Sequence, residues 1–449
     1  MNRLRIVQAV GWYLPDSIGG TELYVAALAA QLREAGHEVR IAAPDTQHGE
    51  REYEHAGCTV YRYPIPAQPT REEARGLVVV RGSERLHQWL SRTRPDVVHV
   101  HTFVTGLGLA EIEAARQTGA RVIVTTHSAA LGFLCERGTL LRDGTHLCDA
   151  RVTADTCAAC ALTQRGLPAT VARVVTGLGQ RLPASVPRPG RVGTALDLAR
   201  LVSERREAQQ RMLEIVDGFV VLSEWARGVV IANGAPAAKV HVNRLGIAPR
   251  AGGWPRKPAA AVRPTTTPLV IGYLGRAEAI KGIDDLVHAA LSVPSGVPLR
   301  LRVVASASNE AERVALRDLA RVASGDARIG FEPAVPPAAV PALLAGFDVL
   351  CCPSRVVEGG PTVALEAHAV GTPVIGSDLP ALSEIVHAPR DGALVPAGDR
   401  AALAALLADL AHTPARVDAW RAALQMPRTF HEVGEQYLAM YQAAEGPCA

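Results

Sequence analysis

Short apolar runs alternate with longer helical patterns from the first residues of the chain onward. Residues 4–10 form one such run, and residues 21–36 follow it with leucine and alanine at helical spacing. Further runs of strand length occupy residues 37–44, 95–103, 121–128, 217–225 and 239–247. Strands separated by segments long enough for crossover helices predict an α/β fold with a parallel sheet.

A second series of the same kind begins after a segment without periodicity. Residues 249–268 are rich in proline, glycine and threonine, which is typical of an interdomain linker. The apolar runs then return at residues 268–275, 300–306, 327–331, 347–354, 372–378 and 392–398. We therefore expect two doubly wound Rossmann-like domains facing a central cleft, because such sheets bind ligands at the carboxyl ends of their strands.

The pattern also predicts where the domains begin and end. The first domain is expected over residues 1–262, with a cysteine-rich insertion at about 132–165. The second is expected over residues 263–427, and the amphipathic segment 428–449 is expected to pack back on the first domain as a helix.

Composition excludes several classes of protein. With 449 residues, 48% of them hydrophobic and 20% charged, the chain has ample material for ordered domains. Aromatic residues make up only 4% and the formal net charge is +3, so neither a stacking platform nor a strongly basic surface points to a nucleic-acid partner. No run reaches the roughly 20 apolar residues of a membrane span, and we expect a cytoplasmic protein.

Charged residues and glycines gather in two segments of the second series, each at a strand-to-helix turn. Arg276 and Lys281 follow a strand that ends at Gly275, where their charges would meet the oxygens of a diphosphate. Gly359 and Gly360 precede a helix, so backbone N–H groups there can approach an anion. The two segments together predict a diphosphate site.

Two carboxylates in the second segment suit an extended ligand. Glu358 and Glu366 are eight positions apart, about 12 Å if the chain between them is helical. One acid would accept hydrogen bonds from a transferred sugar and the other from a nucleotide ribose. The alternative is that the acids lie on a solvated face and the basic residues form surface ion pairs, which each segment alone would favour.

Taken together, these residues resemble the retaining glycosyltransferases of family 4, which have the GT-B fold. The basic pair stands in the family's G-R-x(4)-K-G segment, and the two acids form its E-x(7)-E element. The resemblance implies that Arg276 and Lys281 bind the donor diphosphate, that Glu358 contacts the transferred sugar and that Glu366 contacts the ribose. Ile280 stands where many relatives carry an acid, which leaves the donor preference open.

The first series is similar to the opening of the same family. The resemblance implies that Gly19 and Gly20 form a loop against the donor phosphates and that His127 lines the transferred sugar near its reacting carbon. An ordinary glycine-rich turn and a structural histidine are the alternatives. His99 and His101 share one face of a strand, and we expect a packed or cleft-wall role for them rather than metal ligation.

The resemblance also implies the reaction. The enzyme would be a retaining hexosyltransferase that moves a sugar from a UDP-, GDP- or ADP-sugar to a hydroxyl of a glycan, a lipid-linked saccharide or a small molecule, as in polysaccharide biosynthesis. Catalysis would need no cofactor, since cations and helix amides would stabilise the departing diphosphate. The alternatives are a nucleotide-sugar epimerase or hydrolase of the same fold, and a non-catalytic nucleotide-sugar-binding subunit.

Four cysteines lie in the insertion with the spacing C-x(12)-C-x(8)-C-x(2)-C. They are Cys135, Cys148, Cys157 and Cys160. Four thiolates suit a structural zinc ion, which is our interpretation of this spacing. The alternatives are an iron–sulfur cluster, a redox pair at the last two positions, and four reduced buried cysteines.

The segment after these cysteines is basic. Residues 165–211 contain nine arginines and three acids, and residues 194–216 form an amphipathic helical pattern. Such a helix would meet anionic lipid headgroups, so peripheral contact with an anionic membrane is one interpretation. A solvated helix with its apolar side on the core is the alternative.

Overall fold

The chain is described here by a computed structural model that covers residues 3–74, 76, 78–127, 134–142, 144–183, 188, 190–250, 253–257 and 267–443. It divides into two units. The first comprises Met1–Gly138, Asp149–Leu245 and Phe430–Ala449, and the second comprises Thr139–Cys148 and Gly246–Thr429. The predicted domain boundary between residues 262 and 263 lies outside the described residues.

The first unit is built on an eight-stranded sheet with the order β10-β9-β6-β5-β1-β2-β4-β3. Its strands are β1 (Arg5–Ala9), β2 (Glu38–Asp45), β3 (Arg51–His55), β4 (Cys58–Pro64), β5 (Val97–Val100), β6 (Arg121–Thr125), β9 (Gly218–Val221) and β10 (Val240–Val242). All pairings are parallel except that of β3 with β4. The strand order reverses between β1 and β5, so the loops that follow these two strands meet at the switch point of the sheet.

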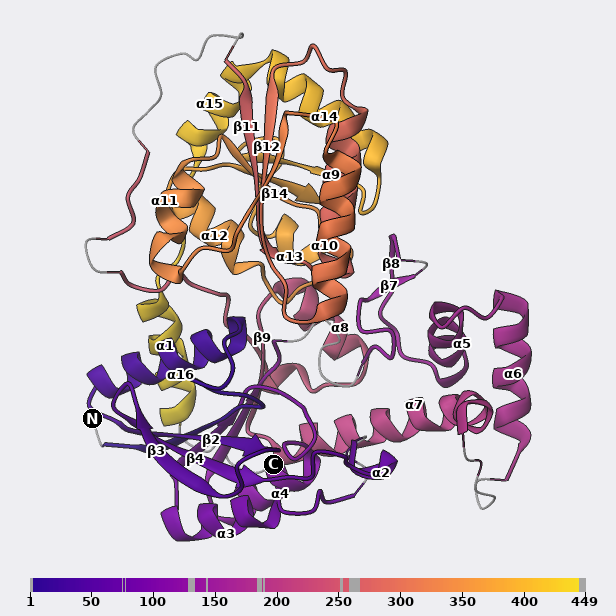
Figure 1. The fold of residues 1–449 in the computed structure, drawn as a ribbon. Helices are drawn as coiled ribbons and strands as arrows, with labels where there is room; N and C mark the ends of the chain where they lie inside the picture. The colour runs from indigo at the N-terminus through magenta and orange to yellow at the C-terminus, as the bar shows by residue number, and fades with distance from the viewer. Residues whose placement is uncertain are drawn as a thin grey trace. The chain divides into compact units, whose positions relative to one another are not determined.

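The second unit contains a six-stranded parallel sheet with the order β13-β12-β11-β14-β15-β16. Its strands β11, β12 and β14 are labelled in Figure 1. Its strands are β11 (Leu269–Arg276), β12 (Leu299–Ser306), β13 (Ile329–Glu332), β14 (Val349–Cys352), β15 (Val374–Ser377) and β16 (Gly392–Val395). Here the order reverses between β11 and β14. The two parallel sheets confirm the predicted α/β class with Rossmann-like units.

Helices cover both faces of the second sheet. One apolar core joins the sheet to α9 (Ile283–Ser292), α10 (Glu310–Ala323), α14 (Arg400–His412) and α15 (Pro414–Ala423). Another joins it to α11 (Val340–Ala345), α12 (Thr362–Ala369) and α13 (Pro380–Ser383). Because aliphatic side chains fill both cores, the strands read as continuous apolar runs in the sequence.

Three helices of the first unit, α5 to α7, lie in the long connection between β6 and β9. The helices of this unit are α1 (Gly20–Glu34), α2 (Arg71–Ala74), α3 (Glu84–Thr93), α4 (Leu109–Gln117), α5 (Ala154–Gln164), α6 (Ala169–Arg181), α7 (Gly190–Ile215), α8 (Glu224–Ala232) and α16 (Phe430–Gln442). A short 3-10 turn occurs in this unit at Ala237–Lys239, and two more occur in the second unit at Ala279–Lys281 and Pro337–Ala339. None of the helices in the described part of the chain combines the length and the apolar character that a membrane crossing needs.

The last helix, α16, completes the core of the first unit through its tyrosines. Tyr437 is fully buried, and its hydroxyl lies 3.0 Å from that of Tyr24 and 2.9 Å from Oγ1 of Thr125. The hydroxyl of Tyr441 lies 2.6 Å from Nδ1 of His99. These contacts bond the end of the chain to the buried ends of β5 and β6.

We expect Tyr437→Ala to lower the free energy of unfolding by about 3–5 kcal/mol, because it empties a large buried site. Tyr437→Phe keeps the ring but removes the hydroxyl that bonds to Thr125 and Tyr24, and it should cost about 1–3 kcal/mol. Urea unfolding followed by circular dichroism measures both changes. An unchanged urea midpoint for Tyr437→Ala would show that α16 contributes nothing to the first unit.

Candidate functional site

The switch point of the second sheet holds a half-buried ion pair. Lys281 ends the short turn after β11, and Glu358 lies in the loop between β14 and α12. Nζ of Lys281 donates a hydrogen bond to Oε2 of Glu358 at 2.6 Å, while Oγ of Ser354 donates to Oε1 at 2.6 Å. Two residues that are 77 positions apart in the sequence are therefore in direct contact at the place where a doubly wound sheet binds its ligand.

Backbone contacts hold the two loops of this pair against each other. Gly282 has a φ of +68°, and a Cβ there would lie 1.9 Å from the carbonyl oxygen of Pro353. The N–H of Arg355 donates to the carbonyl oxygen of Ile280 at 2.7 Å. Only glycine fits at position 282, because the left-handed backbone and the close carbonyl both exclude a side chain.

Two aspartates at the start of α9 anchor the same loop through arginines. The carboxylate of Asp285 is buried and pairs with Arg355 and with Arg400, whose Nε lies 2.7 Å from it. Asp284 pairs with the same two guanidinium groups, at 3.4 Å from Arg355 and 2.8 Å from Arg400. Arg355 belongs to the loop that carries Glu358, and Arg400 begins α14. The two acids therefore tie this loop to the starts of α9 and α14.

A hairpin from the first half of the sequence also touches this loop. It consists of β7 (Leu141–Arg142) and β8 (His146–Leu147), and the residues Thr139–Cys148 belong to the second unit. The N–H of Val357 donates to the carbonyl oxygen of Thr139 at 3.0 Å, and Leu140 is buried. The sequence predicted an insertion here, but it did not predict that the insertion supports the residue next to Glu358.

Glu358 also lines a pocket between the loops that follow β14 and β15. The residues around this pocket are Cys352, Ser354, Val356, Glu358, Pro361, Ser377, Leu379, Ala381 and Leu382. Gly359 and Gly360 lie beside it, directly before α12, and the cap position Pro361 has no side chain that could bond the first N–H groups of that helix. These amides are available to an acceptor atom of a ligand.

The other predicted donor residues have partners of their own. Arg276 pairs with Glu278 of its own turn at 2.7 Å and is half exposed, and Gly275 stands just before it at the end of β11. Glu366 on α12 lies 3.8 Å from Arg250. Burial raises the pKa of Glu366, and Arg250 offsets part of that rise. Arg250 comes from the linker segment, and no pattern in the sequence singles it out.

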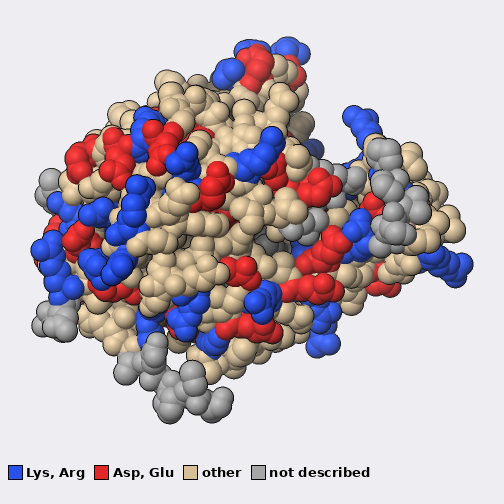
Figure 2. Space-filling view, turned by 90° about the horizontal axis from the view of Figure 1, so that it is seen from below, with Lys and Arg blue, Asp and Glu red and all other residues tan. Residues whose placement is uncertain are grey.

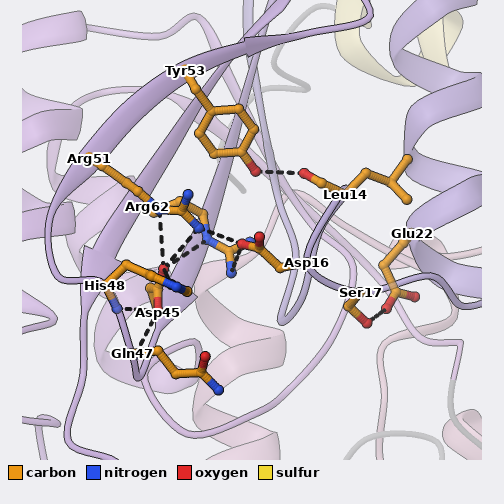
Figure 3. Close-up of polar contacts among 10 residues, drawn as sticks. All are labelled: Leu14, Asp16, Ser17, Glu22, Asp45, Gln47, His48, Arg51, Tyr53 and Arg62. Carbon is orange, nitrogen blue, oxygen red and sulfur yellow. Dashed lines mark hydrogen bonds and ion pairs between the residues drawn. The ribbon is translucent and has the colours of Figure 1, made fainter. Parts of the chain in front are cut away.

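In the first unit, Gly19 and Gly20 lie where the loop after β1 enters α1, and polar side chains hold this loop (Figure 3). The hydroxyl of Tyr53 donates to the carbonyl oxygen of Leu14 at 2.6 Å. Asp16 pairs with Arg51 at 2.5 Å and with Arg62 at 3.3 Å. The β3–β4 pair thus ties down the loop at the switch point of the first sheet.

Asp16, Asp45 and His48 are the one group in the described residues whose atoms lie close enough to hold a metal ion. Arg51 already pairs with both carboxylates, and buried Arg62 also faces them (Figure 3). Burial disfavours the charge of Asp45, but backbone N–H groups and the two arginines outweigh it and lower its pKa to about 2. We interpret the group as an anchor of the loop, because guanidinium groups occupy the carboxylate oxygens.

Buried His99 and His101 and half-buried His127 lie side by side in the first unit. His101 Nε2 lies 2.5 Å from the amide oxygen of Gln8, and His101 Nδ1 lies 3.1 Å from Nε2 of His127. Because an amide oxygen only accepts, His101 donates from Nε2 and accepts from His127. His127 therefore keeps Nδ1 as its second, acceptor atom. His99 is also buried, which confirms a packed role for His99 and His101.

The four cysteines of the insertion are not gathered around one point. None forms a disulfide, and each is partly buried. No three of their sulfur atoms lie within 4.8 Å of one another among the described residues. The arrangement does not support the zinc site that the spacing predicts.

We expect Gly282→Ala to lower the free energy of unfolding by about 1–3 kcal/mol, because alanine is strained at this φ and would overlap the carbonyl of Pro353. Gly296→Ala is the matched control, since a Cβ at that glycine has no atom within 4 Å. Thermal unfolding compares the two variants. Equal melting temperatures would contradict the close approach of the two loops.

His99, His101 and His127 predict a loss of stability in mild acid. Burial lowers the pKa of His127 to about 3 and the pKa values of His99 and His101 well below 6.5. The unfolded chain binds protons that the folded chain excludes, so the stability present above about pH 6.5 should fall as the pH decreases, by up to about 1.4 kcal/mol per pH unit for each ring.

Urea unfolding between about pH 7 and pH 5 tests this expectation. His101→Asn should show a shallower dependence on pH than the unchanged protein, and replacement of His412 on the surface of α14 by Asn serves as the control. A slope that is identical for all three proteins would mean that the buried rings do not stay neutral.

Comparison with known proteins gives two family matches that follow each other along the chain. Residues 19–246 match the family described as a glycosyl transferase 4-like domain, and residues 258–425 match glycosyl transferases group 1. The chain is 28% identical over 418 residues to the D-inositol 3-phosphate glycosyltransferase of Pseudarthrobacter chlorophenolicus, which covers 90% of this chain and 85% of that one. It is 25% identical over 446 residues to the GDP-mannose-dependent alpha-mannosyltransferase of Mycobacterium tuberculosis, which covers 99% and 97%.

Solved structures with the same fold have low sequence identity to this chain. Sucrose-phosphate synthase from Thermosynechococcus elongatus superimposes with a TM-score of 0.66 at 19% identity, over 98% of both chains. Anabaena HepE in complex with UDP gives a TM-score of 0.61 at 14% identity, over 97% of this chain and 98% of that chain. The chain therefore belongs to the glycosyltransferases of family 4, and it has the GT-B fold.

Proposed function

We propose that this enzyme transfers a sugar, with retention of anomeric configuration, from a nucleoside diphosphate sugar to a hydroxyl group of an acceptor. The observation that carries the proposal is the contact of Lys281 with Glu358 at the switch point between β11 and β14. A cation and a carboxylate side by side suit a ligand with an anionic part and a hydroxylated part. The amides before α12 add a second anchor for phosphate.

In the proposed reaction the bond between the anomeric carbon and the diphosphate oxygen breaks, and a bond to the acceptor oxygen forms on the same face. The diphosphate leaves with the bonding electron pair and takes up the proton of the acceptor hydroxyl. Lys281, Arg276 and the amides of Gly359 and Gly360 stabilise the charge that develops on the leaving group. No metal ion takes part in this scheme.

The remaining residues would position the sugar and the nucleotide. Glu358 accepts hydrogen bonds from hydroxyls of the transferred sugar once donor phosphate draws Lys281 away, and Glu366 accepts from the ribose. In the first unit, Nδ1 of His127 accepts a hydrogen bond from the sugar, because its Nε2 proton is already donated inward. Gly19 and Gly20 would let the loop before α1 approach the phosphates.

We further propose that the donor is a UDP-, GDP- or ADP-sugar and that the acceptor is a glycan, a lipid-linked saccharide or a small molecule. A cytoplasmic location and a role in polysaccharide biosynthesis belong to the same proposal. No step of the proposed reaction depends on a zinc ion at the four cysteines.

Replacing Lys281 by Met should reduce product formation by at least about 100-fold, since one stabilising contact to the leaving group is lost. Purified enzyme would be screened by thermal shift with UDP, GDP and ADP, and the sugar derivatives of the stabilising nucleotide would then be assayed. Arg317→Met is the control, because it removes an arginine from the exposed face of α10.

The products separate the competing functions. Transfer that requires an acceptor and gives the donor's anomeric configuration by nuclear magnetic resonance supports the proposal. Hydrolysis or epimerisation of the donor alone would assign the alternative enzyme, and stabilisation by a nucleotide sugar without any turnover would assign a binding subunit. A fully active Lys281→Met variant would contradict the role given to the ion pair.

A further inference from the structure

The helix α6 exposes an apolar stripe that no described residue covers. Its small residues Ala172, Thr176 and Gly179 are buried, and a Cβ at Gly179 would lie 1.8 Å from the carbonyl oxygen of Leu196 on α7. The stripe on its outer side comprises Val171, Val174, Leu178 and Leu182, which are between 42% and 62% exposed. The spacing of three and four residues places Val171, Val174 and Leu178 on one face of the helix, and Leu182 follows its last residue.

Arginines without acidic partners surround this stripe. From residue 156 to residue 196 the sequence contains five arginines and neither an acid nor a lysine. Arg188 pairs with Asp197, but Arg165, Arg173, Arg181 and Arg191 are exposed and form no ion pair with any described residue. By contrast, basic and acidic side chains lie interspersed over the face drawn in Figure 2.

The longer helix α7 does not provide the membrane-facing surface that its sequence indicated. Its apolar side chains Leu198, Leu201, Val202, Met212 and Leu213 are buried in the first unit. Its arginines are largely neutralised, as in the pairs of Arg200 with Glu204, Arg205 with Glu136 and Arg211 with Glu113. Its role is to carry α5 and α6, which lie beside its first half in Figure 1.

We propose that the outer face of α6 docks on an anionic lipid surface. The four apolar side chains would enter the boundary between headgroups and acyl chains, while Arg173, Arg181 and the flanking Arg165 and Arg191 would meet lipid phosphates. Val192, exposed at the start of α7, would extend the apolar contact. The proposal does not depend on the sugar-transfer reaction, because none of these residues belongs to the candidate site.

Charge selects the lipid surface over a second copy of the chain. Two copies that met through this face would bring their unpaired arginines together, with no acid from residues 156 to 196 to offset the repulsion. A surface of negative phosphates instead neutralises every one of them. Its attraction should decrease as salt concentration rises, since exposed charges are screened.

Sedimentation with vesicles tests the proposal. The full-length protein should bind vesicles of phosphatidylcholine with phosphatidylglycerol at low salt, more weakly at high salt, and weakly to phosphatidylcholine alone. The double variant Val174→Asp and Leu178→Asp should bind the anionic vesicles at least about tenfold more weakly and keep its melting temperature, because both side chains point outward.

The charge-matched control is the double variant Val314→Asp and Val322→Asp. These two valines are 41% and 56% exposed on α10 of the second unit, so the same change is made on another helix. This control should bind like the unchanged protein. The proposal is overturned if the unchanged protein fails to bind anionic vesicles at low salt, or if both double variants bind equally well. Light scattering that finds a dimer lost only in the α6 variant, without vesicle binding, would assign the face to a second copy instead.

Discussion

The contact between a lysine and a glutamate at the reversal of a parallel sheet is the interaction on which the candidate site depends. Lys281 and Glu358 reach each other because β11 and β14 are neighbours in the sheet although they are distant in the sequence. Their loops are then fixed by Gly282, by the hydrogen bond from Arg355 to Ile280 and by the paired aspartates of α9. Loops held this rigidly place both side chains at one site before any ligand arrives, which lowers the cost of ordering on binding.

Much of the fold was predictable because each buried parallel strand appears in the sequence as a short continuous apolar run. Every apolar run proposed from the sequence overlaps a strand of one of the two sheets, since both faces of these strands are covered by helices. The β3–β4 pair and the β7–β8 hairpin were not predicted. β3 has a half-exposed strand pattern rich in charge, and β7 and β8 are two residues each, so neither produces an apolar run.

The site was predictable only in part. A residue's type shows which ligands it can bind, but not which other side chains of the protein it contacts. Lys281 and Glu358 were proposed as ligand groups, and their direct contact emerged only from the strand order. Arg276 and Glu366 were proposed in the same way, yet each is paired with a residue that the sequence did not single out. The cysteines give the opposite lesson: a spacing that suits zinc carries no information on whether the sulfur atoms converge.

The hairpin at Thr139–Cys148 means that the two halves of the sequence are not the two halves of the molecule. A fragment that begins at Gly246 would contain all of the second sheet but would lack the carbonyl that receives the N–H of Val357. During synthesis on the ribosome the hairpin emerges long before that loop. The segments on either side of the hairpin can fold with the first unit before the hairpin can bond to Val357. Cutting the chain at residue 245 would therefore separate the second unit from a hairpin that belongs to it.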